Sequence, residues 1–299
     1  MQSYRPHSAY IATARLTPEL YRLIFGVIAI EMLYGLGLDV VGAVLASLPP
    51  EFADSYYYGT TAAGLLAQLF SFALLGGSVM LVARRLNFRP PMSLIGPAGP
   101  AREGFVLALF AGLGVFLLIE ILPPYWSTLG AETLGIGRWL LLLPLAIAGL
   151  TVQTAAEELL YRGYIQQQLA ARFASPWVWM IVPNLLFAAA HWESGSDPVD
   201  AMEYVIWAFF FGVIASDLTA RSGTLGAAIG FHLANNIYAF LFFAERGAPD
   251  SGLALLLFPP SPDLLPPSAG AEPFPSLGLA IELGTLLVMW LAARLALRR

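Results

Sequence analysis

Long apolar stretches recur along the whole of this 299-residue chain, and they constrain its fold more than any other feature. Hydrophobic residues make up 58% of the sequence and charged residues only 12%, against about 25% charged in an ordinary soluble domain. Such a chain cannot cover a water-facing surface, so we expect lipid to surround most of it. With roughly 20 apolar residues for each span, the candidates lie near 23–47, 61–83, 104–122, 139–158, 176–192, 203–219, 225–244 and 277–296.

These stretches predict an all-α fold, a polytopic membrane bundle of about eight transmembrane helices. Helices are required because lipid offers no hydrogen-bond partner to an open sheet edge. The first run, 23–47, is too long for the core of a signal peptide. We see no internal repeat and no separable soluble domain, so residues 1–299 are expected to form a single integral membrane domain.

The composition also removes several kinds of chemistry. The chain has no cysteine, which excludes disulfides, thiolate metal ligands and cysteine nucleophiles. It has no lysine either, so a lysine Schiff base and a Ser–Lys dyad are excluded. No basic cluster with interleaved aromatic residues is present, so we expect no nucleic-acid partner.

Arginine placement predicts the orientation in the membrane. If the N-terminus is inside, only Arg138 and Arg246 of the 15 arginines fall on the outer side. The positive-inside rule predicts this asymmetry, so both termini are expected to be cytoplasmic. Residues before the first span, His7 among them, are expected to form a polar tail. The arginines assigned to the inner side are Arg5, Arg15, Arg22, Arg84, Arg85, Arg89, Arg102, Arg162, Arg172, Arg221, Arg294, Arg298 and Arg299.

The densest group of charges at membrane depth is Glu157-Glu158-Leu-Leu-Tyr-Arg162. A charge there costs at least ~2.5–3.5 kcal/mol on insertion scales, so each one calls for a partner or a function. Glu158 and Arg162 are four residues apart with the acid first, the favourable order for a helical ion pair. Glu157 lies about 100° around the helix from Glu158 and has no local cation, which suits it to accepting a proton.

The two histidines on hydrophobic stretches are His191 and His232. Asn236 follows His232 by one helical turn and faces the same way. If the helix that carries Glu157 turns back near residues 175–176, Glu157 and His191 both lie about 25 Å from the turn and can face each other. This geometry predicts one shared site.

Three short patterns, Glu-Glu-x-x-x-Arg, Phe-x-x-x-His and His-x-x-x-Asn, occur in this order on consecutive hydrophobic segments. Together they resemble the signature of the CAAX protease and bacteriocin-processing family, which includes the Ras-converting enzymes and the bacterial Abi-type proteins. The resemblance covers about residues 139–244, the motif-bearing core. The matching residues are Glu157, Glu158, Arg162, Phe187, His191, His232 and Asn236.

The resemblance implies an intramembrane endopeptidase with a polar cavity in the bundle core that opens toward the cytosol. It also implies that Glu157 and His191 activate a water and that His232 and Asn236 stabilise the oxyanion. The residue chemistry agrees, because an acid beside an imidazole can act as a general base. An amide and an imidazole on one helix face also supply donors in a low-dielectric site. The residues expected to support the structure are Glu158, Arg162 and Phe187.

A metal is an open question at this point. Glu157, His191 and His232 could form a His₂Glu set like that of catalytic zinc sites. However, no His-Glu-x-x-His helix places two ligands together, and these three come from separate stretches. Both a divalent metal such as Zn²⁺ and no metal are compatible with the sequence.

Two other functions compete with an endopeptidase. The first is a non-catalytic immunity or adaptor protein of the same fold, and the second is a proton-coupled transporter in which the acid and the histidines form a relay. Glu31 and Asp39 lie on one face of the first span, where they could line a cavity. The substrate would be a membrane-associated peptide or protein, and the composition indicates a bacterial inner membrane.

Overall fold

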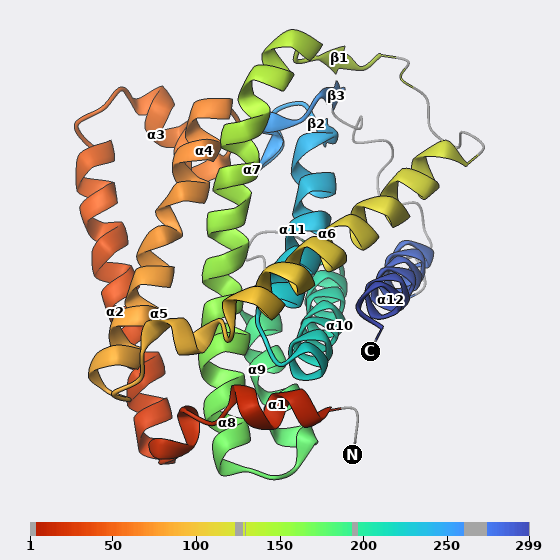
Figure 1. The fold of residues 1–299 in the computed structure, drawn as a ribbon. Coiled ribbons are helices and arrows are strands. Elements are labelled where there is room, and N and C mark those ends of the chain that lie inside the picture. Colours follow the sequence, from red (N-terminus) through yellow and green to blue (C-terminus); the bar gives the residue numbers. More distant parts are fainter. Residues whose placement is uncertain (1–3, 123–127, 129, 193–196, 260–273, 299) are drawn as a thin grey trace.

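The computed structural model describes residues 4–122, 128, 130–192, 197–259 and 274–298, and these form an all-α bundle with a small sheet at one end. The main helices are α2 (Leu20–Leu45), α4 (Ala62–Ser71), α5 (Ala73–Arg85), α6 (Ala98–Ile121), α7 (Ile136–Glu158), α9 (Pro176–Ala189), α10 (Pro198–Ser222), α11 (Gly226–Leu241) and α12 (Leu277–Leu297). In Figure 1, α2 lies at one edge and α12 at the other, with α7 and α11 between them.

Six helical units among the described residues are long and apolar enough to cross a bilayer. α4 and α5 together make one of them, and α7 belongs to another that continues to Arg172. The predicted count of eight is not confirmed, because α9 has 14 residues and α11 has 16. These lengths correspond to about 21 and 24 Å, short of the ~30 Å hydrocarbon core.

α11 is a core helix, and protein rather than lipid surrounds it. Most of its residues are buried, and it packs against α6, α7 and α10. Figure 1 shows it behind α6 in the middle of the bundle. A helix without a lipid-facing side can carry polar residues such as His232 and Asn236 that would be costly against lipid. The stretch 225–244 is therefore an interior helix, which its moderate apolarity also reflects.

Two glycines allow α6 to cross α11 at close range. A Cβ atom added at Gly226 would overlap the carbonyl oxygen of Ala101, and one added at Gly230 would overlap the carbonyl oxygen of Phe105. Small residues at a helix crossing let the two backbones approach in this way. The position of α11, and with it that of His232, depends on this crossing.

The helix that carries the two adjacent glutamates runs without interruption from Ile136 to Arg172, a length of 37 residues. At about 55 Å it exceeds the bilayer core and must extend beyond it. Its middle part, η4 (Leu159–Gln166), has the π form, and α8 (Gln167–Arg172) completes it. The helix therefore continues past the end of the predicted span 139–158.

The polar run is buried at the end of this helix. The guanidinium of Arg89 donates to Gln167 Oε1 at 2.6 Å and to Gln168 Oε1 at 3.1 Å. Gln168 Nε2 donates to the carbonyl of Thr17 at 3.0 Å. The residues before the first span therefore cover this end of the long helix and shield its glutamines from water.

The N-terminal residues form helix α1 (Arg5–Tyr10) and the turn η2 (Ala14–Leu16). The prediction of a polar tail is wrong here, because His7 is buried and its ring lies 4.5 Å from that of Trp179. Burial, together with the charge of Arg15, lowers the pKa of His7 to about 4. His7 therefore packs as a neutral ring under the bundle.

At the opposite end, three short strands form a sheet that the sequence did not predict. Their order is β1-β3-β2, with β1 antiparallel and β2 parallel to β3, and Leu257 of β3 lies opposite Glu132 and Ala244. The sheet ties the chain after α11 to the chain before α7. The strands and the remaining short helices are β1 (Glu132–Thr133), β2 (Phe243–Glu245), β3 (Leu256–Phe258), α3 (Pro50–Tyr58), η3 (Pro91–Leu94) and η5 (Ser251–Leu253).

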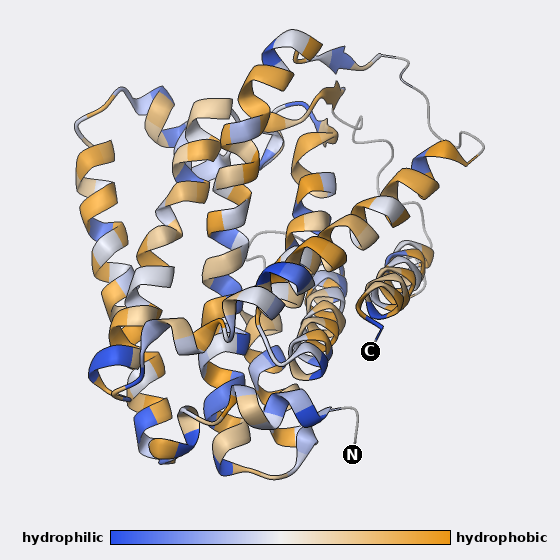
Figure 2. Ribbon diagram, in the orientation of Figure 1, coloured by the Kyte–Doolittle hydropathy of each residue, from blue (hydrophilic) through white to orange (hydrophobic). Residues whose placement is uncertain are grey.

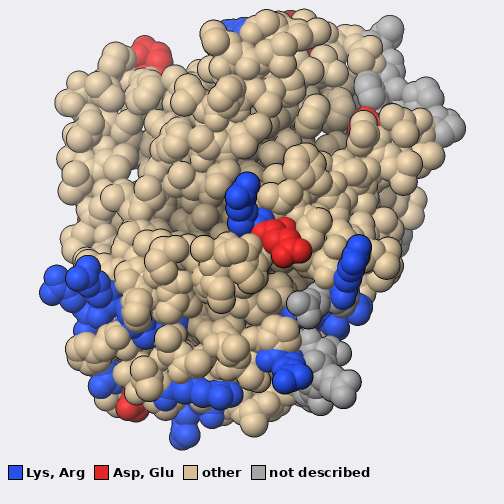
Figure 3. All heavy atoms as spheres, viewed as in Figure 1, with Lys and Arg blue, Asp and Glu red and all other residues tan. Residues whose placement is uncertain are grey.

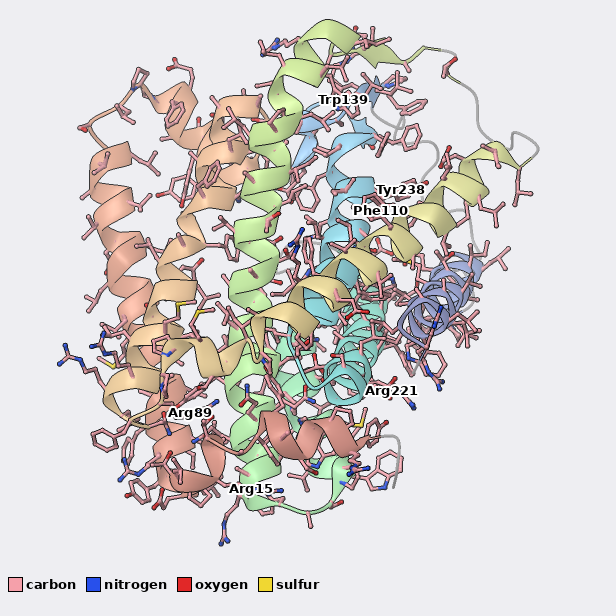
Figure 4. The ribbon with its side chains drawn as sticks, viewed as in Figure 1. Arg15, Arg89, Phe110, Trp139, Arg221 and Tyr238 are labelled. Carbon is pink, nitrogen blue, oxygen red and sulfur yellow. The ribbon has the colours of Figure 1, made fainter. Side chains whose placement is uncertain are left out.

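Hydrophobic and basic residues occupy different parts of the bundle. Hydrophobic residues dominate the middle of the helices in Figure 2, and basic side chains gather over the lower half of the face in Figure 3. Arg162 departs from the predicted distribution, because it is fully buried within the long helix and does not lie in a connecting segment. We call the lower end the arginine-rich end; Arg15, Arg89 and Arg221 lie toward it in Figure 4.

We expect Gly230→Val to destabilise the bundle by about 1–3 kcal/mol, because the added side chain must push α6 away from α11. Thermal unfolding of the purified protein in detergent measures this as a lower midpoint. Gly114→Ala is the matched control, since Gly114 lies on α6 with nothing within 4 Å of an added Cβ. Equal midpoints for the two variants would contradict the close crossing.

Candidate active site

A cavity of about 510 Å³ lies among α6, α7, α10, α11 and α12 and reaches the end of α9. The four residues predicted to be catalytic come from three separate stretches of chain, and all of them line it. Aromatic and aliphatic side chains form most of the remaining wall. The polar residues of the cavity wall near α7, α9 and α11 are Gln153, Glu157, His191, His232, Asn235 and Asn236.

The carboxylate of Glu157 has one engaged oxygen and one free oxygen. Its Oε1 accepts a hydrogen bond from Gln153 Nε2 at 2.7 Å. Its Oε2 is buried, has no hydrogen-bond partner among the described residues and lies 3.7 Å from His232 Nε2. A buried carboxylate oxygen without a partner is costly, so this oxygen is a natural acceptor for a water in the cavity.

The carboxylate of Glu158 points away from the cavity into a buried network. Its side chain is 0% exposed, and its Oε1 accepts from Arg162 Nη1 at 3.0 Å and lies 2.9 Å from His232 Nδ1. Arg162, also 0% exposed, donates from Nη2 to Asn184 Oδ1 at 3.1 Å. The pair is thus intrahelical, as predicted, and it also connects to α9 and α11.

This network sets the orientation of the His232 ring. A carboxylate can only accept, so His232 Nδ1 carries the proton shared with Glu158. The other ring nitrogen, Nε2, is then the one that faces Glu157 and the cavity. In the protonated ring both nitrogens donate, and Nε2–H can serve an oxygen in the cavity.

Phe187 and Ser216 complete the surroundings of the ion pair. The guanidinium carbon of Arg162 lies 4.5 Å from the centroid of the Phe187 ring, a cation–π contact in a buried setting. Asn184 Nδ2 donates to Ser216 Oγ at 2.9 Å and so ties α9 to α10. Phe187 is 1% exposed, and these contacts explain a structural role for it.

His191 lies just beyond the end of α9 and not within a span. Its Nδ1 lies 2.7 Å from the carbonyl oxygen of Phe187, which can only accept, so Nδ1 carries the proton. The lone pair on Nε2 is left for the cavity that the ring lines. In this tautomer His191 can accept a proton or a hydrogen bond from water.

An amide chain runs from α11 to Glu157. Asn235 Nδ2 donates to Asn236 Oδ1 at 3.2 Å, Asn236 Nδ2 donates to Gln153 Oε1 at 2.9 Å, and Gln153 in turn donates to Glu157. Sequence reasoning missed Gln153, although its place one turn before Glu157 on the same helix face was a usable signal. Asn236 keeps a second amide hydrogen for a ligand.

The cavity lies in the half of the bundle remote from the arginine-rich end. Most of its wall comes from the C-terminal halves of α6 and α11 and the N-terminal halves of α10 and α12, while His232 belongs to the N-terminal half of α11. Figure 4 shows Tyr238, a lining residue, well above Arg15, Arg89 and Arg221. The cytosolic opening that the resemblance implies stays a prediction.

Glu31 and Asp39, which the sequence placed on one stripe, do not line this cavity. Both belong to α2, at the edge of the bundle, and both are exposed on its surface. The face of α2 that carries both acids points away from the other helices of the bundle.

The suggested metal ligands Glu157, His191 and His232 do not fit a metal site in this geometry. Over the described parts of the chain, no three His, Asp or Glu side chains are arranged to hold one ion. The Nδ1 atoms of both rings are engaged, by Glu158 and by the carbonyl of Phe187, so only the Nε2 atoms are left for the cavity. We therefore derive no step through a metal.

Comparison with known proteins agrees with this site. The sequence model of the Rce1-like family, type II CAAX prenyl endopeptidases, matches residues 138–238, which contain Glu157, His191, His232 and Asn236. This segment is similar to that family, and the resemblance predicted from the three patterns is confirmed. The match supports a CAAX-type intramembrane protease fold for this segment, and the six long apolar helices make the chain an integral multi-pass membrane protein.

The chain is also similar to a bacterial protein, the uncharacterized protein YyaK of Bacillus subtilis (strain 168). The two are 24% identical over 193 residues, and the match covers 63% of each of them. The chain thus spans less than two thirds of the length of this relative. No solved structure matches the chain.

Arg162→Met leaves Glu158 as a buried charge with only His232 beside it, and we expect a loss of about 3–5 kcal/mol in folding stability. Unfolding in detergent is the measurement, and Arg84→Met, which removes an exposed arginine, is the matched control. Removing both charges, with Glu158→Leu added, should recover part of the loss. If Arg162→Met is as stable as Arg84→Met, the buried network contributes little to folding stability.

Proposed function

We propose that this protein is an intramembrane endopeptidase of glutamate type that hydrolyses a peptide bond in a membrane-associated peptide or protein. The observation that carries the proposal is the free Oε2 atom of Glu157. It is buried on a cavity that also receives the rings of His191 and His232 and the amide of Asn236. A general base, a second proton acceptor and two donors thus border one space.

Glu157 is proposed to take the proton of the attacking water. The hydrogen bond from Gln153 holds Oε1, so Oε2 has a defined position. The lone pair of His191 Nε2 supplies a second acceptor for the same water. Two acceptors on one water orient its oxygen lone pair toward the carbonyl carbon of the substrate, and general-base assistance of this kind contributes about 10²–10⁴-fold.

His232 and Asn236 are proposed to stabilise the oxyanion of the tetrahedral intermediate. Glu158 holds the Nδ1 side of the His232 ring, so a proton on Nε2 is directed to the cavity. Asn236 keeps one amide hydrogen after its bond to Gln153. Donors preorganised in a low-dielectric site are worth far more than donors in water.

The membrane setting is part of the proposal. The substrate enters from the bilayer or its surface, and the protein works in a bacterial inner membrane with both termini cytoplasmic. The sidedness of the arginines supports this orientation. The motif-bearing core at 139–244 would then supply the reactive groups, within a single integral membrane domain of 299 residues.

Glu157→Gln should abolish cleavage, with a fall in rate of at least about 10²-fold, because the amide cannot accept the proton. The measurement is a comparison of peptide N-termini in membranes of cells that make the wild-type protein or the variant. Glu31→Gln is the matched control, since it makes the same change on the exposed face of α2. Cleavage products that persist in Glu157→Gln would rule out this mechanism. Retained partner binding without any cleavage would favour the adaptor alternative.

Chelation should leave the rate unchanged within about twofold, because the reactive groups act without a shared ion. The purified protein is treated with EDTA and with 1,10-phenanthroline, and cleavage of a peptide identified in the preceding experiment is measured. A loss that added Zn²⁺ restores would contradict the glutamate mechanism.

A further inference from the structure

Helix α12 closes one side of the cavity and brings a second carboxylate to it. Glu282 and Thr285 both line the cavity, together with apolar residues of the same helix face. α12 begins at Leu277 and lies outside the segment that the family model matches. This wall is therefore a feature that the three sequence patterns do not account for.

Glu282 has no hydrogen bond or ion pair with any other described residue, and the charge that acts on it is another acid, Glu203. Glu203 is itself engaged, because both its oxygens accept from Ser276, at 2.6 Å from the backbone N–H and 2.5 Å from the hydroxyl. An unpaired acid on an apolar helix that faces a cavity marks a binding or transport function.

The other walls of the cavity suit a cation. None of the described lining residues is an arginine, and the chain has no lysine. Tyr204 and Trp207 stack at 5.9 Å, and Phe116 and Tyr238 stack at 4.1 Å between ring centroids. Aromatic faces and a carboxylate are the two groups that attract an ammonium or guanidinium ion.

We infer that the cavity recognises a positively charged side chain, Lys or Arg, close to the scissile bond of the substrate, with Glu282 as its counter-ion. The inference rests on the proposed function and names its substrate class. Glu157 belongs to α7, where Gln153 holds it, and Glu282 belongs to α12. The acid proposed to react and the acid proposed to bind the substrate cation therefore come from different helices.

Binding without turnover is the first test. The probe is a fluorescent, N-acetylated apolar peptide with one central lysine, and its matched partner carries norleucine at the same place. Both are titrated against Glu157→Gln protein in detergent micelles. The lysine peptide should bind at least 10-fold more tightly, and adding Glu282→Gln should remove that difference. A norleucine peptide with a free N-terminus distinguishes a terminal amine from a side chain as the cation.

Cleavage preference is the second test. Purified protein is incubated with a proteome-derived peptide library made by cleavage after glutamate, so that lysine and arginine remain internal. Sites that the wild type cuts and Glu157→Gln does not should carry a basic residue at one fixed position relative to the cleaved bond. Glu282→Gln should lower kcat/KM at least 10-fold for these sites, and Glu282→Arg should favour acidic residues there. Glu31→Gln is the control and should match the wild type.

The outcomes separate the two proposals. Equal binding of the lysine and norleucine peptides, or Glu157-dependent sites without a basic preference, overturns the inference and leaves the peptidase in place. Lysine-selective binding that depends on Glu282, with no cleavage anywhere, supports the inference and overturns the peptidase. Tight binding of the free N-terminus alone overturns the side-chain assignment.

Discussion

The buried ion pair between Glu158 and Arg162 is the contact on which the rest of this protein depends. Neither charge can reach water, so each requires the other, and removal of one partner from such a pair is strongly destabilising. The pair extends to His232 on α11 and to Asn184 on α9. It thereby joins three helices at the depth of the candidate site, and it holds the imidazole in the orientation that the proposed chemistry needs.

The division between lipid-facing and interior helices explains where that chemistry can lie. α2 is at the edge of the bundle and carries only exposed acids in its middle, whereas α11 is enclosed by α6, α7 and α10. Because α11 meets protein on nearly all sides, it can carry a histidine and two asparagines. The glycines at 226 and 230 bring α6 close enough to complete this enclosure. The enclosure of α11 by its neighbours therefore both packs the bundle and allows polar side chains at this depth.

The groups proposed to react and the helices that form the rest of the cavity wall come from different parts of the chain. Residues 138–238 supply the carboxylate, the imidazoles and the amides, while α6 and α12 shape the cavity around them. The cavity also lies away from the arginine-rich end.

The sequence by itself determined the membrane class, the helical fold and the identity of the candidate residues. These follow from apolar run length and from residue order, which are local properties. It also predicted the pairing of Glu158 with Arg162, because an i, i+4 contact depends only on the helix. Only the tertiary structure decided that α11 is interior, that His7 is buried, and that Gln153 links Asn236 to Glu157. It also decided the depth of the cavity and the presence of Glu282 on its wall. Each of these depends on which helices pack together, and hydropathy along a single chain carries no information about its neighbours in space.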